Sequence, residues 1–268
     1  MAQSPFEIKK EICDIGKRIY DHGFVAANDG NISVKVGPNE FYCTPTGVSK
    51  GFMTPDMIIK IDANGNKIEG KLNPSSEIKM HMRVYKERPD VKSVVHAHPV
   101  YATSFAIAGI PLTDPIMPEA VIALGCVPIA EYGTPSTEEI PDAVSKYLPY
   151  FDAVLLENHG ALAFSDSLLN AYHKMESVEF YAQLLYQSKM LGGPKQLSDA
   201  QVQRLYEIRR QFGLKGKHPA DLCPNNKAGK PSCHSCGNCN GSCSSGSNSD
   251  ADDIIAQITK NVLAQLGK

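Results

Sequence analysis

The stretch that most restricts the fold of this chain is VVHAHP, residues 94–99, an apolar run that carries two histidines. Its two valines are β-branched and favour a strand. Because alternate residues of a strand point to the same face, His96 and His98 are expected to lie side by side. On a helix they would point about 200° apart. The run therefore predicts a strand that ends at Pro99 and presents two imidazoles together.

Paired imidazoles suit a metal such as zinc, although two hydrogen-bonded core histidines would fit the same spacing. A third histidine, His159, follows an apolar run in LLENHGALAF and precedes a glycine, which allows a tight turn. Three histidines with one open position form the pattern of a catalytic zinc site. The spacing by itself leaves both interpretations, metal ligands and core histidines, open.

The periodicity of residues 1–212 predicts one layered α/β domain. Helices are expected at 5–22, 74–88, 100–109, 136–148, 167–191 and 198–213. Strands are expected at 31–36, 40–44, 57–62, 67–70, 92–98, 125–132, 152–158 and 160–165. The first four strands read as two hairpins, the second with Asn-Gly in its turn. These hairpins favour an antiparallel or mixed sheet.

The composition changes after residue 212. Residues 213–250 are rich in Gly, Ser, Asn, Pro and Cys and are predicted to be a flexible linker. Residues 251–268 return to helical spacing, and their apolar residues share one face: Ile255, Ile258, Val262 and Leu266. An isolated helix of this length is marginally stable in water, so we expect it to dock on a partner.

Charge and hydropathy exclude two classes of partner. The formal net charge of −2 offers no polybasic surface, so nucleic acid is not expected. No run approaches 18 apolar residues, so no membrane span is expected. The N-terminus lacks the apolar core of a signal peptide and reads as a helix capped by Ser4. These features favour a cytoplasmic protein.

Three short polar segments are candidates for binding an anion. Glu77 stands in NPSSEIK, at the start of an expected helix, where a carboxylate can act as a cap or favour the helix dipole. Ser75 and Ser76 can also be caps, but two hydroxyls at a helix N-terminus also suit an anion. The turns NDGN (28–31) and TPTG (44–47) offer backbone amides to a phosphate, or are simply turns.

Taken together, these motifs carry a resemblance. In chain order they are GNIS (30–33), TPTG (44–47), SSE (75–77), HAH (96–98) and NHG (158–160). With this order and spacing the chain resembles the class II aldolase/adducin family over most of residues 1–212. The resemblance implies a layered α/β/α domain with a central mixed, largely antiparallel sheet. It also implies a homotetramer with active sites near the subunit interfaces.

The resemblance implies a role for each motif. His96, His98 and His159 would bind one Zn²⁺ per subunit, and Glu77 would be the catalytic acid/base. The substrate phosphate would be held by Gly30, Asn31, Thr46, Gly47, Ser75 and Ser76. The implied reaction is reversible cleavage of L-fuculose 1-phosphate, or a related deoxyketose 1-phosphate, to dihydroxyacetone phosphate and L-lactaldehyde. No lysine Schiff base is needed for it.

Other functions within the family stay open. Its ribulose-phosphate 4-epimerases read SSD where this chain has Glu77, which favours an aldolase. A methylthioribulose-phosphate dehydratase and a non-catalytic, adducin-like binding module are further alternatives. The tyrosine proton donors of the family aldolases are not matched, since Phe212 stands where one is expected. Tyr132, Tyr206 or Glu119 could substitute, although each also fits a structural role.

The C-terminal segment lies beyond the aldolase resemblance. Residues 251–268 resemble an encapsulation peptide, which implies docking on a shell protein or other cargo inside a bacterial microcompartment. The alternative is a helix that folds back on its own tetramer. The cysteines Cys233, Cys236, Cys239 and Cys243 have ferredoxin-like spacing without the final proline. Cys223 or His234 could complete a site, and an iron–sulfur cluster, zinc, redox cross-linking and no metal all stay open.

Overall fold

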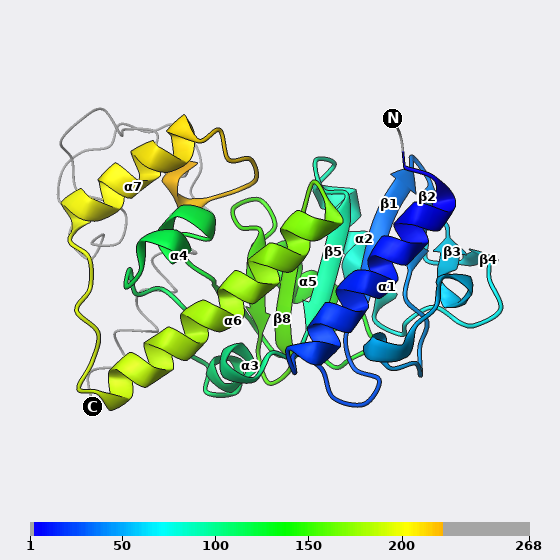
Figure 1. The fold of residues 1–268 in the computed structure, drawn as a ribbon, viewed down its shortest axis with the longest axis horizontal. Coiled ribbons are helices and arrows are strands. Elements are labelled where there is room, and N and C mark those ends of the chain that lie inside the picture. The colour runs from blue at the N-terminus through cyan, green and yellow to red at the C-terminus, as the bar shows by residue number, and fades with distance from the viewer. Residues whose placement is uncertain (1–2, 222–268) are drawn as a thin grey trace.

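The computed structural model describes residues 3–221, and these form an eight-stranded sheet with helices on both faces (Figure 1). The strand order is β4-β3-β2-β1-β5-β8-β7-β6. The strands are β1 Asn31–Gly37, β2 Glu40–Cys43, β3 Ile59–Ile61, β4 Lys67–Glu69, β5 Ser93–Ala97, β6 Ile129–Ala130, β7 Ala153–Leu156 and β8 Gly160–Ser165. Neighbours pair antiparallel except for β6 and β7, which are parallel. The predicted α/β fold with a mixed, largely antiparallel sheet is confirmed.

The helices divide between the two faces of the sheet. They are α1 Pro5–Asp21, α2 Ile78–Glu87, α3 Val100–Ile107, α4 Pro118–Ala123, α5 Glu139–Ser145, α6 Leu168–Met190 and α7 Asp199–Gln211. Helices α1, α3 and α6 pack on one face, and α2 and α5 on the other (Figure 1). As predicted, α1 is capped by Ser4, whose side chain accepts from the Glu7 amide in a capping box. Within residues 3–221, none of these helices has the length and apolar character needed to cross a bilayer.

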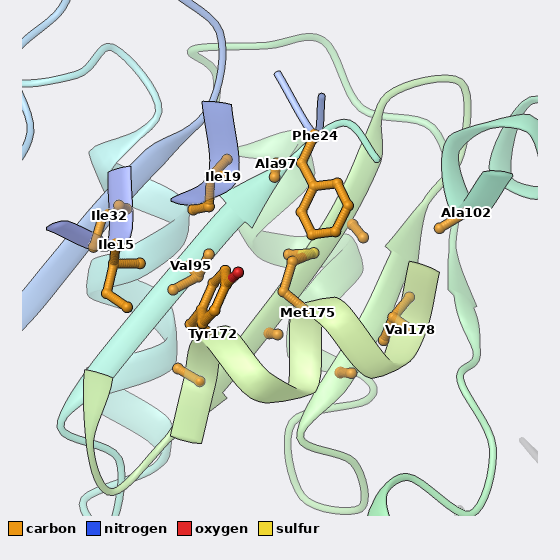
Figure 2. Close-up of a cluster of buried hydrophobic side chains, with 14 of the residues drawn as sticks. Ile15, Ile19, Phe24, Ile32, Val95, Ala97, Ala102, Tyr172, Met175 and Val178 are labelled. Atoms are coloured by element: carbon orange, nitrogen blue, oxygen red, sulfur yellow. The ribbon is translucent and has the colours of Figure 1, made fainter. Parts of the chain in front are cut away.

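Each face of the sheet has its own hydrophobic core. Figure 2 shows Val95 and Ala97 of β5 on the same side as Tyr172 and Met175 of α6, all of them buried. The second core lies under α2 and α5 and includes Val94. Because side chains alternate along a strand, the even-numbered residues of β5 face α2. Strand alternation thus directs the first histidine of VVHAHP toward the N-terminus of α2.

The segment before α2 differs from its prediction. The helix expected at 74–88 begins only at Ile78. Pro74 instead forms an isolated β-bridge with Pro45, and the Ser75 amide donates to Thr44 O at 3.3 Å. The backbone at Pro74 and Ser75 is therefore paired with the loop that follows β2, and residues 76–77 form a turn, so the helix begins only after them.

Three further elements differ from what the sequence predicts: two strands are shorter and one helix is additional. The strand expected at 57–62 is β3 alone, since Pro55–Met57 form a 3₁₀ turn that begins with proline. The strand expected at 125–132 is reduced to β6, and Val127 pairs with Leu112 outside the sheet. Helix α4, which begins at Pro118, was not predicted. It is only six residues long, too short for a clear apolar period.

The described chain continues past α7 to Asp221. His218 is buried, and its Nε2 lies 2.8 Å from Val121 O of α4, while its Nδ1 accepts from the Ala220 amide at 3.1 Å. Residues 218–220 therefore pack on α4. The remainder of the predicted linker, the cysteines Cys223 to Cys243 and the predicted helix at 251–268 lie outside the described residues.

Candidate active site

Sheet topology brings the ends of β1, β5 and β8 together. Strand β5 lies between the other two, so Asn31 is paired with His96 and Ala97 is paired with Ala161. His159 immediately precedes β8 and therefore lies next to the end of β5. The three histidines predicted from HAH and NHG meet there. The His96 and His98 Nε2 atoms are 3.1 Å apart, and the His159 ring centroid is 4.7 Å and 5.0 Å from those of His96 and His98.

In His96 and His98, the ring nitrogen that points away from the cluster, Nδ1, lies near an acceptor. His96 Nδ1 lies 2.9 Å from Ala161 O, and because a carbonyl only accepts, Nδ1 carries the proton. The Nε2 lone pair of a neutral His96 then faces the other two histidines. His98 Nδ1 lies 3.5 Å from Asp29 Oδ2. Metal-ligating histidines are held in this way, with one ring nitrogen on a carbonyl or carboxylate and the other on the metal.

The donor set fits a divalent metal. One ligand atom from each of His96, His98 and His159 lies within 4.8 Å of the others. Burial lowers the pKa of His96 to about 3 and also lowers the pKa of His98, so both are neutral near pH 7, the form that binds metals. His159 Nδ1 and Asn31 Oδ1 are buried and have no hydrogen-bond partner among residues 3–221, as expected where a further group completes a site. Three imidazoles and an open position are compatible with zinc.

Glu77 faces the histidines rather than capping α2. It occupies the N-cap position, yet its side chain makes no capping hydrogen bond. Its Oε2 accepts from Asn31 Nδ2 at 2.9 Å, and its Oε1 lies 3.2 Å from His159 Nε2. Burial alone would raise the pKa of Glu77, but His96, His159 and the Asn31 amide outweigh burial and hold it well below its usual value. The carboxylate is therefore ionised near neutral pH.

The predicted phosphate-binding residues share one cavity with this cluster. A cavity of about 210 Å³ is lined by Gly30, Asn31, Thr46, Gly47, Ser75 and Ser76 together with Glu77, His98 and His159. The remaining lining residues are Asn28, Asp29, Pro45 and Lys50. Lys50 is a site residue that the sequence does not predict, because no motif marks it after the TPTG turn. Fully buried His96 is not among the lining residues.

Two backbone features shape this cavity. The Pro45–Pro74 bridge and a 3.0 Å bond from the Thr46 amide to Asn73 O hold the TPTG loop against the SSE segment. Gly30 has φ of 73°, and a Cβ there would lie 2.9 Å from His96 O. Glycine is therefore required where the first loop passes the end of β5.

The three substitutes considered for the missing tyrosine do not line the cavity. Tyr206 is buried between α7 and the residues near α4, and burial raises its pKa well above its usual value. Tyr132 and Glu119 are exposed. Within residues 3–221 of one subunit, none of the three is placed to donate a proton to a bound substrate.

Replacing Gly160 with alanine should loosen the histidine cluster. A Cβ there would lie 2.5 Å from Ala97 O and 2.7 Å from His98 Cδ2, so β5 and β8 must move apart. We expect Gly160→Ala to lower the free energy of unfolding by about 1–3 kcal/mol and to weaken zinc binding. Denaturant unfolding and zinc titration measure the two effects. Gly37→Ala, whose Cβ would meet only the Glu40 side chain at 3.4 Å, is the matched control. Equal zinc affinity in both variants would contradict the expectation.

The chain matches known proteins over this same region. Residues 10–186 match the family model described as Class II Aldolase and Adducin N-terminal domain. An L-fuculose phosphate aldolase of Methanococcus maripaludis is 35% identical over 176 residues, which cover 66% of this chain and 94% of that protein. A 5-deoxy-D-ribulose 1-phosphate aldolase of Bacillus thuringiensis is 31% identical over 208 residues, covering 76% and 96%.

Solved structures agree with the sequence matches. An L-fuculose 1-phosphate aldolase superimposes with a TM-score of 0.72 at 32% identity and covers 80% of this chain and 99% of its own. The L-fuculose-1-phosphate aldolase of Thermus thermophilus gives a TM-score of 0.61 at 30% identity, covering 70% and 98%. The chain therefore belongs to the class II aldolase and adducin family.

Proposed function

We propose that this class II aldolase is zinc-dependent and cleaves a deoxyketose 1-phosphate to dihydroxyacetone phosphate and an aldehyde, with L-fuculose 1-phosphate as the first candidate substrate. The observation that supports this most is the position of Glu77. Its carboxylate lies 3.2 Å from His159 and lines the same cavity as the small polar loops. The residues proposed as acid/base, metal ligands and phosphate ligands thus lie in or beside one cavity.

Each group of residues can be assigned a step of the proposed reaction. The amides and hydroxyls of the loops around Gly30, Thr46 and Ser75 hold the phosphate and so fix the carbon chain. In the synthetic direction the Glu77 carboxylate removes a proton from C3 of dihydroxyacetone phosphate, and the electron pair moves onto the C2 carbonyl. As the C2 carbonyl re-forms, C3 bonds to the aldehyde carbon, whose C=O electron pair moves onto its oxygen and takes up a proton, and cleavage is the reverse. When bound at the three histidines, zinc supplies Lewis-acid polarisation of the carbonyl oxygen.

The relatives differ in the aldehyde half of the substrate. L-Fuculose 1-phosphate would release lactaldehyde, whereas 5-deoxy-D-ribulose 1-phosphate would release acetaldehyde. Both share C1 to C3 and the phosphate, the half for which this cavity provides candidate ligands. We propose L-fuculose 1-phosphate first because several relatives carry that name, and 5-deoxy-D-ribulose 1-phosphate as the second candidate.

Product analysis tests the proposal. The purified protein is incubated with each ketose phosphate, and dihydroxyacetone phosphate is measured with a coupled dehydrogenase before chelation, after it and after zinc return. Zinc-restored release of dihydroxyacetone phosphate from either sugar is the expected result. A product with an intact carbon chain and inverted stereochemistry would indicate an epimerase. Loss of water from methylthioribulose phosphate would indicate a dehydratase. If the protein binds the sugar phosphate but does not turn it over, it would be the adducin-like binding module.

We further propose that the protein is a homotetramer and that residues 251–268 dock it on a microcompartment shell protein or other cargo. The support is the family resemblance and the amphipathic spacing of that segment. A chain truncated after residue 250 should keep its activity and its tetrameric mass by analytical ultracentrifugation but lose co-purification with microcompartments. Co-purification that is unchanged by the truncation would reject the docking role.

A further inference from the structure

Lys50 is a buried lysine at the wall of the candidate active-site cavity. It begins a 3₁₀ turn, Lys50–Phe52, and is only 2% exposed, although lysine is rarely buried. Its Nζ donates to Asn28 O at 2.9 Å and to Val48 O at 2.7 Å. The first carbonyl belongs to the loop before β1 and the second to the loop after β2. One ammonium group thus holds together two loops that line the cavity.

The backbone of Lys50 is fixed from the opposite side. Gly16 of α1 approaches so closely that a Cβ there would lie 2.8 Å from Lys50 O. Helix α1 therefore packs directly on the main chain from which the lysine side chain extends. This contact restricts where the ammonium group can lie.

Without Lys50, the lysine, arginine and carboxylate side chains that line the cavity would carry only negative charge. Among the described residues that line it, Lys50 is the only lysine or arginine, whereas Asp29 and Glu77 are carboxylates. A phosphate monoester carries close to two negative charges near neutral pH, and desolvating it beside carboxylates is costly unless a positive charge compensates. An ammonium group has three donors, and the described contacts use two of them.

We propose that Lys50 is the fixed positive charge of this cavity, recognising the phosphate group of the substrate by charge while its hydrogen bonds position both loops. The inference deepens the proposed function and rests on it, since that function supplies the phosphorylated substrate. Burial lowers the pKa of Lys50 to about 8, and nearby Asp29 partly opposes this, so the side chain is mainly charged near pH 7. Lys50 acts on binding and orientation, whereas Glu77 performs proton transfer.

Binding of inorganic phosphate tests the proposal without requiring turnover. Titration calorimetry compares the zinc-loaded wild type with Lys50→Met, which keeps the chain length but removes the charge, and Lys50→Arg, which keeps it. Lys10→Met, at an exposed lysine of α1, is the matched control. We expect Lys50→Met to weaken phosphate binding by about 10-fold or more, Lys50→Arg to retain most of it and Lys10→Met to leave it unchanged.

A second readout separates charge recognition from loop positioning. With dihydroxyacetone phosphate as substrate, Lys50→Met should raise KM more than it lowers kcat. With unphosphorylated dihydroxyacetone, wild type and Lys50→Met should differ little. Equal losses with both substrates, or unchanged phosphate affinity, would reject Lys50 as the charge that recognises phosphate.

The inference stays testable if Lys50→Met does not fold, and its failure can be told apart from failure of the proposed function. If Lys50→Met does not fold, NMR of the lysine side chains in the wild type replaces it, and phosphate must shift the Lys50 signals but not those of Lys10. Absence of that shift rejects the inference. If the wild type cleaves the sugar phosphate but phosphate binding neither depends on Lys50 nor shifts its NMR signals, only the inference fails. If the wild type neither binds phosphate nor cleaves, the proposed function fails with it.

Discussion

Glu77→Gln should lower kcat for aldol cleavage by about 10²- to 10⁴-fold while the protein still binds metal. The substitution keeps the size of the side chain and one carbonyl oxygen that can accept from Asn31 Nδ2, as Glu77 Oε2 does at 2.9 Å. It removes the carboxylate that we propose takes up the proton. Because the three histidines are untouched, zinc content should stay at one per subunit. Steady-state kinetics and metal analysis of the same preparation measure the two quantities.

The control for this variant is Glu207→Gln, an exposed carboxylate on α7. It should match the wild type in kcat and KM. Glu77→Gln should reduce kcat but change KM for the phosphorylated ketose little, because we propose that other residues hold the phosphate. A kcat close to that of the wild type would show that another group transfers the proton.

One part of the histidine cluster, the placing of His96 beside His98, was predictable because it depends on a local rule. Alternation along a strand places His96 and His98 on one face, and the His159-Gly160 turn between two apolar strands predicts a hairpin. The spatial meeting of the two segments was implied by the family resemblance, and the structure shows its cause. Strands β5 and β8 pair antiparallel in a register that joins Ala97 to Ala161.

Other features depend on long-range pairing that a sequence does not display. The start of α2 was misplaced because Pro74 pairs with Pro45, far away in the chain, and this bridge overrides the local capping pattern. Lys50 was missed for the same reason. Its burial depends on the loops around Asn28 and Val48 and on α1, and a lysine between Ser49 and Gly51 looks solvent-exposed in the sequence.

His98→Ala should weaken zinc binding by more than the roughly 10- to 100-fold that loss of a supporting hydrogen-bond partner costs, since it removes one of the three proposed ligands. Activity should fall with zinc occupancy. His98 is the better test position than His96 because its side chain is 25% exposed, whereas His96 is fully buried and its loss would also damage the core. Zinc titration monitored by a chromophoric chelator gives the affinity, and aldol cleavage at each zinc concentration gives the dependence of activity on occupancy.

The controls for this prediction separate ligand loss from misfolding. His173→Ala removes an exposed histidine of α6 and should bind zinc like the wild type. Chelated wild-type protein should recover its activity at stoichiometric zinc, whereas His98→Ala should need a large excess. Because burial keeps His96 neutral, its nitrogen stays available to a metal near neutral pH, so the remaining two histidines should still hold zinc weakly. Full zinc affinity in His98→Ala would mean that the metal is not bound at the end of β5. The proton transfer proposed for Glu77 would then lack a neighbouring Lewis acid.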